Sequence, residues 1–287
     1  MKTSYLKYFV SLLLFGLNGI VASRIHLSSS YIVFLRTLIG SIFLIIVYLL
    51  SRQGFHCIQH KKDLLYIVIS GVSMGASWIF LFEAYDQIGV SIASLLYYCA
   101  PILVMALSPV LFGEKLTGVK VAGFFVVLAG VVCVNGNVFG GRGNLFGIFC
   151  GLMSAVLYTV MVITNKKSEY IKGMGNTVIQ LVSGFLTVAV IVGIQSGYEV
   201  RIENGDWLWI LILGIVNTGI GCYFYFSSIG NLPVQTVAVC GYLDPLSAVI
   251  FSVVLLHEKM LPIQVFGAVL ILGGALFAEC YKKKKTA

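Results

Sequence analysis

Residues 97–134 read YYCAPILVMALSPVLFGEKLTGVKVAGFFVVLAGVVCV, and residues 241–278 read GYLDPLSAVIFSVVLLHEKMLPIQVFGAVLILGGALFA. In one ungapped register, offset by 144 residues, 11 of these 38 positions are identical. The identities include Tyr98 with Tyr242, Pro101 with Pro245, and Glu114-Lys115 with Glu258-Lys259. Apolar composition alone does not align prolines and a Glu-Lys pair, so the chain is an internal duplication.

The repeat extends well beyond this stretch. In the same register Gly40 aligns with Gly184, and Gly75 aligns with Gly219. We therefore predict two repeats, at residues 1–139 and 144–287, joined by a glycine-rich turn.

The composition is that of a membrane protein. Hydrophobic residues make up 59% of the chain and charged residues 10%, whereas roughly a quarter of the residues of a soluble domain are charged. A helix needs about 20 mostly apolar residues to cross a hydrocarbon core of about 30 Å. By that rule the sequence predicts ten transmembrane helices, at residues 4–23, 30–51, 64–86, 90–112, 117–137, 144–165, 174–197, 206–228, 234–256 and 260–281.

The net charge is +8, and the positions of the Lys and Arg residues agree with the predicted topology. With a cytoplasmic N-terminus, the inner segments carry 14 Lys and Arg residues and the outer segments carry four, while Arg36 lies within a helix. This distribution is the positive-inside pattern of multi-pass proteins. We therefore expect a plasma-membrane protein with both termini in the cytoplasm, surrounded by membrane lipid and with no nucleic-acid partner.

Five helices per repeat is an odd number, so the second repeat enters the membrane from the side opposite to the first. The sequence thus predicts an all-α integral membrane protein of ten transmembrane helices, arranged as two inverted five-helix repeats. Inverted repeats place a binding site near the membrane midplane, at the pseudo-two-fold axis between the halves.

These features resemble the drug/metabolite transporter superfamily, and within it the EamA type. Each repeat has a proline in its fourth helix, a Glu-Lys pair at the end of that helix and a glycine-rich fifth helix. Three segments are similar to motifs of that family: Phe-Glu-Ala-Tyr at 82–85, Tyr-Tyr-Cys-Ala-Pro at 97–101 and Tyr-Leu-Asp-Pro at 242–245. The resemblance covers nearly the whole chain and implies a secondary transporter, commonly an exporter of amino acids or other small metabolites.

Asp244 is the sharpest candidate for a site residue. It lies about ten residues into the ninth predicted helix, beside Pro245. A charge at that depth costs about 3 kcal/mol or more unless it faces water or a partner. Two interpretations stay open: a substrate or proton site that lines a cavity, and a structural ion pair or neutral buried acid.

Arg36 and Glu83 are predicted at similar depths in the outer half of the membrane. A packed ion pair is one interpretation, and a gate that opens with the outer mouth is another. Direct contact with the substrate is a third, because a guanidinium group can hold a carboxylate through two parallel hydrogen bonds.

Polar and aromatic residues concentrate in predicted helices 1, 3, 4, 6, 8 and 9, while helices 5 and 10 are almost purely apolar. We expect helices 5 and 10 to face lipid or a partner and the others to surround a cavity with aromatic walls. The candidate lining residues are Asn18, Trp78, Tyr97, Tyr98, Tyr158, Thr159, Asn217, Tyr223, Tyr225 and Tyr242. For any single tyrosine, core packing or an interfacial position is the favoured interpretation, and contact with the substrate is the alternative.

The predicted transport cycle is alternating access without ATP. Pro101 and Pro245 are the predicted hinges, because a proline removes a backbone hydrogen bond from its helix. The proton is the simplest coupling ion for a site without clustered oxygen ligands, with Asp244 as first carrier and Glu83 as second. Glu114 and Glu258 are expected to be interfacial caps, with ion coupling as the alternative.

The sequence contains no motif that predicts an enzyme. His257-Glu258-Lys259-Met260-Leu261 lacks the second histidine of a zinc-protease helix, and no nucleotide-binding motif is present. We expect no cofactor, no metal and a small-molecule substrate, with the chain a monomer or a homodimer. Export is the favoured direction. The alternatives are an uptake carrier or facilitator for a vitamin-like or nucleobase-like solute, and a channel or lipid scramblase.

Overall fold

The computed structural model describes residues 2–51, 60–88, 93, 96–115, 117–135, 145–195, 197–198, 200, 202–256 and 261–280. Within these residues all regular structure is helical. The helices of the first half are α1 (Lys2–Gly16), α2 (Asn18–Ala22), α3 (Ser29–Leu50), α4 (Lys61–Ile88), α6 (Ala100–Phe112) and α7 (Gly118–Asn135). Those of the second half are α8 (Leu145–Lys167), α9 (Gly173–Gln195), α10 (Trp207–Leu211), η3 (Ile212–Ile220), α11 (Gly221–Ile229), α12 (Val234–Cys240), α13 (Leu243–Leu256) and α14 (Pro262–Cys280).

The predicted all-α membrane fold is confirmed. Each of the ten predicted ranges holds at least one described helix. In the part of the chain that the structure describes, six helical segments are long and apolar enough to cross a membrane, and shorter apolar helices accompany them. Predictions that concern the linker at 140–143 and the pair Glu258-Lys259 lie outside the described residues.

Large apolar side chains cover much of the outside of the bundle. Val110 is 82% exposed, Ile194 is 81% exposed and Leu50 is 77% exposed. Polar side chains, by contrast, lie inside: Gln180, Thr218 and Ser228 are 0% exposed. This distribution is the reverse of a soluble domain and suits a bundle that lipid surrounds.

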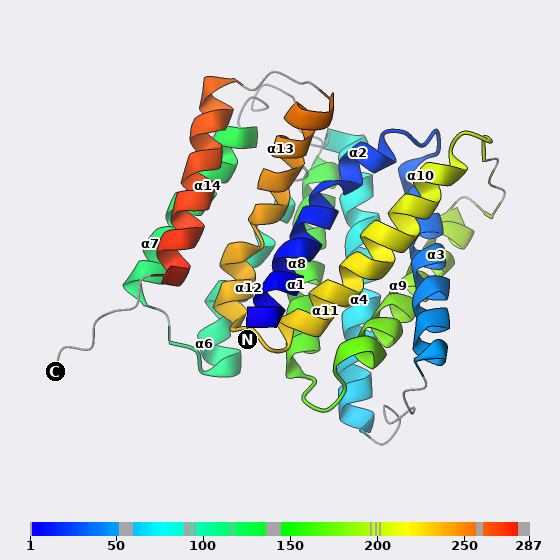
Figure 1. Cartoon of the computed structure of the whole chain (residues 1–287), viewed down its shortest axis with the longest axis horizontal. Coiled ribbons are helices and arrows are strands. Elements are labelled where there is room, and N and C mark those ends of the chain that lie inside the picture. Colours follow the sequence, from blue (N-terminus) through cyan, green and yellow to red (C-terminus); the bar gives the residue numbers. More distant parts are fainter. Residues whose placement is uncertain are drawn as a thin grey trace.

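The helices pack with the symmetry of an inverted repeat. The contact of α4 with α8 has its counterpart in that of α11 with α1, and the contact of α9 with α4 has its counterpart in that of α3 with η3. Equivalent helices also meet each other, because α3 contacts α9, α6 contacts α12 and α7 contacts α14. In Figure 1 α1 begins at its lower end, and α14 ends at its lower end.

Helices α7 and α14 form a pair at one side of the bundle (Figure 1). A Cβ atom added to Gly130 would lie 2.6 Å from the carbonyl oxygen of Gly267, and one added to Gly274 would lie 2.8 Å from that of Gly123. These distances are too short for any side chain, so glycine is what permits this helix contact. The four glycines form two equivalent pairs in the repeat register, and their contacts are therefore reciprocal.

The fourth helix of each repeat is interrupted midway. In the second repeat α12 ends at Cys240 and α13 begins at Leu243. In the first repeat Tyr97 is helical, Tyr98 and Cys99 form a turn, and α6 begins at Ala100. The two interruptions thus occupy nearly equivalent positions, 144 residues apart.

The expected reason for the proline hinges is wrong. Pro101 is the second residue of α6, and Pro245 is the third residue of α13. First-turn N–H groups have no partner within a helix, so neither proline removes a hydrogen bond from a continuous helix. Both prolines instead start a new half-helix directly after the interruption, and their role as hinges stays a prediction.

Candidate functional site

The two helix interruptions meet at the centre of the contact between the repeats. The hydroxyl of Tyr242 donates a hydrogen bond of 2.8 Å to the backbone carbonyl of Tyr98. The two rings have centroids 6.4 Å apart. Because Tyr98 and Tyr242 are equivalent residues, this contact lies at the pseudo-two-fold axis, where an inverted repeat is expected to bind its solute.

A cluster of tyrosines surrounds this point. The hydroxyls of Tyr158 and Tyr225 are 2.7 Å apart and share a hydrogen bond. The ring of Tyr97 meets that of Tyr158 edge to face at 5.3 Å, and the ring of Tyr8 lies 5.6 Å from that of Tyr225. The structure therefore joins Tyr97, Tyr98, Tyr158, Tyr225 and Tyr242, all identified in the sequence, into one aromatic wall.

Asp244 lies in the first turn of α13 and is partly exposed. Among the described residues no hydrogen-bond or ion-pair partner holds its carboxylate, although its backbone N–H donates to the carbonyl of Gly241 at 3.1 Å. Electrostatic interactions connect it to Arg36, Tyr8, Tyr97, Tyr98 and Tyr158. The carboxylate thus lies near the tyrosine cluster, and among the described residues no tyrosine hydroxyl forms a hydrogen bond with it.

Arg36 lies on α3 of the first repeat, whereas Asp244 lies on the second. Its side chain is buried, and its Nε donates a 2.9 Å hydrogen bond to the hydroxyl of Thr218 on η3. Its guanidinium carbon lies 4.9 Å from the centroid of the Trp78 ring. Thr218 in turn donates to the carbonyl of Leu213, five residues earlier, at 2.7 Å. This contact with the fifth preceding residue matches the π-helical geometry of η3, and it leaves the Thr218 hydroxyl oxygen free to accept from Arg36.

Arg36 and Glu83 do not form the ion pair that the sequence suggested. Glu83 accepts a 3.0 Å hydrogen bond from Gln87, one turn later on α4. The guanidinium instead donates through Nε to the Thr218 hydroxyl and lies over the Trp78 ring. Similar depth in the membrane was the only signal for the pair, and depth does not fix the direction of a side chain around its helix.

The remaining candidates are placed in two ways. Asn217 donates to the carbonyl of Leu14 at 2.8 Å and to the side chain of Asn18 at 3.1 Å, so these two asparagines join η3 to the first helix. Tyr223 lies apart from the cluster's hydrogen bonds, with the Lys7 ammonium 5.0 Å from its ring centroid. Tyr223 therefore contacts a lysine near the start of α1 and is not part of the tyrosine cluster.

Two residues of this arrangement, Tyr8 and Thr218, were not among the candidates predicted from the sequence. Tyr8 is 0% exposed and donates to the carbonyl of Val237 at 2.8 Å. Thr218 aligns with Met74 in the repeat register, so the duplication gave no sign of a polar partner there.

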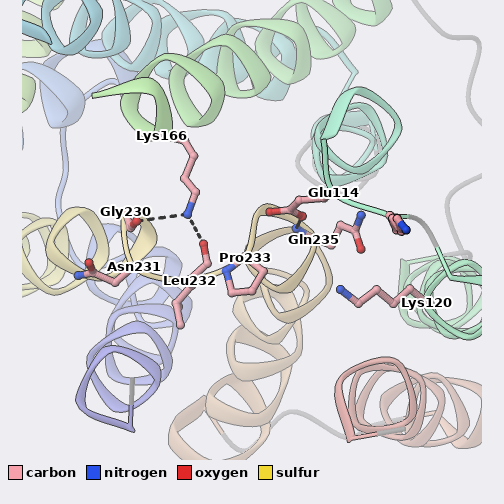
Figure 2. Close-up of a pocket in the computed structure, with 9 residues that line it drawn as sticks. Glu114, Lys120, Lys166, Gly230, Asn231, Leu232, Pro233 and Gln235 are labelled. Atoms are coloured by element: carbon pink, nitrogen blue, oxygen red, sulfur yellow. Dashed lines mark hydrogen bonds between the residues drawn. The ribbon is translucent and has the colours of Figure 1, made fainter. Parts of the chain in front are cut away.

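A second polar region lies at the end of the bundle where α11 turns into α12. Glu114 accepts hydrogen bonds from the backbone N–H of Val234, at 2.7 Å, and of Gln235, at 3.2 Å. The interpretation of Glu114 as a cap therefore holds, but the helix that it caps belongs to the other repeat. Figure 2 shows Lys166 beside it, with its amino group bonded to the carbonyls of Gly230 and Leu232.

The central arrangement has the chemical groups that a solute carrying both charges would need. It offers one free carboxylate, one guanidinium and an aromatic surface between helices from both repeats. In the residues that the structure describes, no group of three or more His, Cys, Asp or Glu side chains could hold a metal ion.

Comparison with known proteins identifies a family and two relatives. The profile of the EamA-like transporter family matches residues 2–136 and again residues 145–279. The chain is 26% identical over 278 residues, 95% of its length and 88% of the relative's, to "Uncharacterized transporter YxxF" of Bacillus subtilis (strain 168). It is also 26% identical over 213 residues, 71% of its length and 72% of the relative's, to "Aromatic amino acid exporter YddG" of Ancylobacter novellus.

A solved crystal structure shares the fold. It aligns with a TM-score of 0.83 at 23% sequence identity, over 96% of this chain and 97% of that chain. The relatives matched are named as transporters and not as enzymes.

Proposed function

The chain belongs to the EamA-like transporter family, and on that premise we propose that it is a secondary carrier for a small zwitterionic solute with an aromatic or apolar side chain. The protein works by alternating access, and export is its direction. Its membrane is the plasma membrane, with both termini in the cytoplasm.

The observation that carries this proposal is the placement of Asp244 and Arg36. They come from opposite repeats, interact electrostatically, and among the described residues form no ion pair with each other. A solute between them would present its amino group to the carboxylate and its own carboxylate to the guanidinium. The tyrosine rings provide an apolar surface for the rest of the solute, and aromatic faces also attract an ammonium group.

The name of the relative from Ancylobacter novellus supports the aromatic part of the proposal, because it describes an exporter of aromatic amino acids. Stacked or edge-to-face contacts with tyrosines favour an aromatic side chain over an aliphatic one by about 0.5–1.5 kcal/mol. We therefore rank phenylalanine, tyrosine and tryptophan ahead of leucine and valine as solutes.

Proton coupling is part of the proposal. The side-chain carboxylate of Asp244 has no hydrogen-bond or ion-pair partner among the described residues, so it is our first candidate to exchange a proton as the solute arrives and leaves. Glu83 is the second candidate, but it already accepts a hydrogen bond from Gln87. With Asp244 as the proton carrier, the proton and the solute's amino group compete for one carboxylate, which links their movements.

The test is transport by the purified full chain in liposomes. Wild-type protein should accumulate labelled phenylalanine when a pH gradient is imposed, and uptake should saturate. Asp244→Asn should abolish accumulation driven by the pH gradient, while exchange of labelled for unlabelled solute survives better. Asp86→Asn, which removes an exposed carboxylate from α4, is the matched control and should behave as wild type.

Four outcomes would contradict the proposal. Unchanged pH dependence in Asp244→Asn would make Asp244 structural and leave a facilitator, or coupling through Glu83. Flux that does not saturate and shows no exchange would indicate a channel, and flux of labelled phospholipid alone would indicate a scramblase. Reporter fusions at the two ends of the chain test the topology, which fails if the reporters report opposite sides.

A further inference from the structure

A pocket of about 480 Å³ opens at the end of the bundle where the α6–α7 connection meets the α11–α12 turn (Figure 2). Its volume lies within the range of about 300–1,000 Å³ that small-molecule sites occupy. Three lysines line it, against one carboxylate: Lys115, Lys120, Lys166 and Glu114. It is distinct from the tyrosine cluster, with which it shares no lining residue.

Two of the four charges are already used within the protein. Glu114 accepts from two backbone N–H groups at the start of α12, and Lys166 donates to the carbonyls of Ile229, Gly230 and Leu232. Each charge satisfies backbone groups that a helix end leaves without partners. What remains is a pair of cations, Lys115 and Lys120, whose amino groups have no acceptor among the described residues.

Gln235 adds an unsatisfied acceptor to the same pocket. Its side chain is 1% exposed, and its Oε1 atom has no hydrogen-bond partner among the described groups. The Ser108 hydroxyl donates to the carbonyl of Met105 at 3.0 Å and accepts from Gln235 Nε2 at 3.2 Å, and this assignment of the network leaves the amide oxygen as the atom without a partner. In Figure 2 the amide oxygen lies on the side of Lys120. A buried carbonyl oxygen of this kind needs a donor from outside.

We propose that this pocket binds a phosphate group that carries a neighbouring hydroxyl, as in a glycerol phosphate. The phosphate oxygens accept from Lys115 and Lys120, and the hydroxyl donates to Gln235 Oε1. Leu232 and Pro233 form the apolar side of the pocket. The bound group joins the α6–α7 connection of the first repeat to the α11–α12 turn of the second.

The same chemistry has two sources. One is the head group of an anionic phospholipid, because the pocket lies at the end of the helices where most of the lysines are predicted. The other is a soluble glycerol phosphate. The experiment therefore uses two probes: glycerol 1-phosphate added to detergent-purified protein, and nanodiscs of phosphatidylcholine with or without phosphatidylglycerol.

The readout is the shift of the thermal unfolding midpoint at constant ionic strength, with retained lipid counted by native mass spectrometry. The double variant Lys115→Ala/Lys120→Ala should weaken binding at least tenfold. The control Lys2→Ala/Lys61→Ala removes two exposed lysines from the same end of the bundle but none from the pocket, and should bind as wild type. Gln235→Leu should weaken glycerol 1-phosphate several-fold and leave methyl phosphate, which has no neighbouring hydroxyl, unchanged.

A shift with phosphatidylglycerol alone assigns the site to lipid, and a shift with the soluble probe assigns it to a phosphorylated metabolite; either supports the proposal. Equal loss in the control variant would show that surface charge alone is responsible and would overturn it. Absence of binding by both probes would overturn it as well. If Gln235→Leu does not fold, the lysine variant and its control still decide the question.

Discussion

The two repeats have the same arrangement of helices but differ in the positions of their charged side chains. Tyr98 and Tyr242 mark equivalent interruptions, and the helix contacts on either side of them are reciprocal. Yet Asp244 is matched by Ala100, and Arg36 is matched by Gln180. The comparison shows that the duplication provides the scaffold, while the proposed site depends on two charges that each occur in one repeat alone.

The largest expected effect comes from moving the carboxylate across the pseudo-two-fold axis. Asp244→Ala should reduce phenylalanine transport at least tenfold, and adding Ala100→Asp should not restore it. Ala100 is 1% exposed and the backbone around it is packed, so a carboxylate there cannot reach the solute. Transport in liposomes measures both variants, and recovery in the double variant would show that the two repeats are chemically interchangeable.

The next effect concerns the cation. Arg36→Gln gives the first repeat the residue that the second repeat has at this position, and it should lower transport of phenylalanine about tenfold. Phenethylamine, which lacks the carboxylate, should compete equally well against both proteins, because it has no group for Arg36 to bind. Equal loss of phenylalanine and phenethylamine binding would mean that Arg36 only supports the packing of Trp78 and Thr218.

Substitutions in the glycine contact between α7 and α14 test whether the two helices pack reciprocally. Gly130→Val and Gly274→Val should each lower the free energy of unfolding by about 1–3 kcal/mol, and by similar amounts, because each forces the same two helices apart. Gly273→Val is the control, since a Cβ atom there meets nothing within 4 Å. Unfolding in a denaturing detergent gives the values, and a marked inequality between the first two variants would contradict reciprocal packing.

A smaller effect separates the two central tyrosines. Tyr242→Phe removes a hydrogen bond to the carbonyl of Tyr98 and should cost about 1 kcal/mol of stability. Tyr98→Phe should cost close to nothing, because the described residues offer its hydroxyl no partner. Equal costs in the same unfolding assay would show that the axis is more symmetric than the hydrogen bonds indicate.

The smallest effect depends on pH. Asp206 accepts from the backbone N–H of His26 at 2.9 Å and lies 3.0 Å from its ring Nδ1, just as Asp63 accepts from the N–H groups of Glu169 and Tyr170 at the other end of the bundle. The hydrogen bond with Asp206 raises the pKa of His26, and the same bond lowers the pKa of Asp206. The contact with the histidine therefore depends on the protonation of its ring.

The sign follows from these directions. Because the pKa of His26 is raised on folding, its contribution is complete below the unfolded value of about 6.5 and is lost as the pH rises through the folded value. The contribution of Asp206 is lost only in acid. His26→Gln should therefore lower the unfolding midpoint more at pH 5.5 than at pH 8.5, whereas Asp63→Asn should show no such difference. A pH-independent effect of His26→Gln would assign the contact to the backbone N–H alone.

Much of the fold could be predicted because the residues that repeat in register are ones that affect backbone conformation or end a helix. Prolines, glycines and the Glu-Lys pair define the register, and the length of the apolar runs defines the helices. The interruption at Tyr242 and the π-helical turn at Thr218 could not be predicted, since both depend on contacts between helices and not on local preference. Arg36 and Asp244 were identified because a charge within an apolar run is conspicuous, but their partners depend on the direction of each side chain.

The π-helical segment η3 also determines the rotation of the following helix, α11, about its own axis. In an α-helix each residue turns the chain by about 100°, so each extra residue taken up by η3 rotates α11 by that angle relative to an uninterrupted helix. Tyr225 points toward Tyr158 and Tyr8 only with this rotation in place. Deleting one residue between Ile212 and Thr218 would restore ordinary winding and carry the Tyr225 ring away from its neighbours, without altering a single aromatic residue.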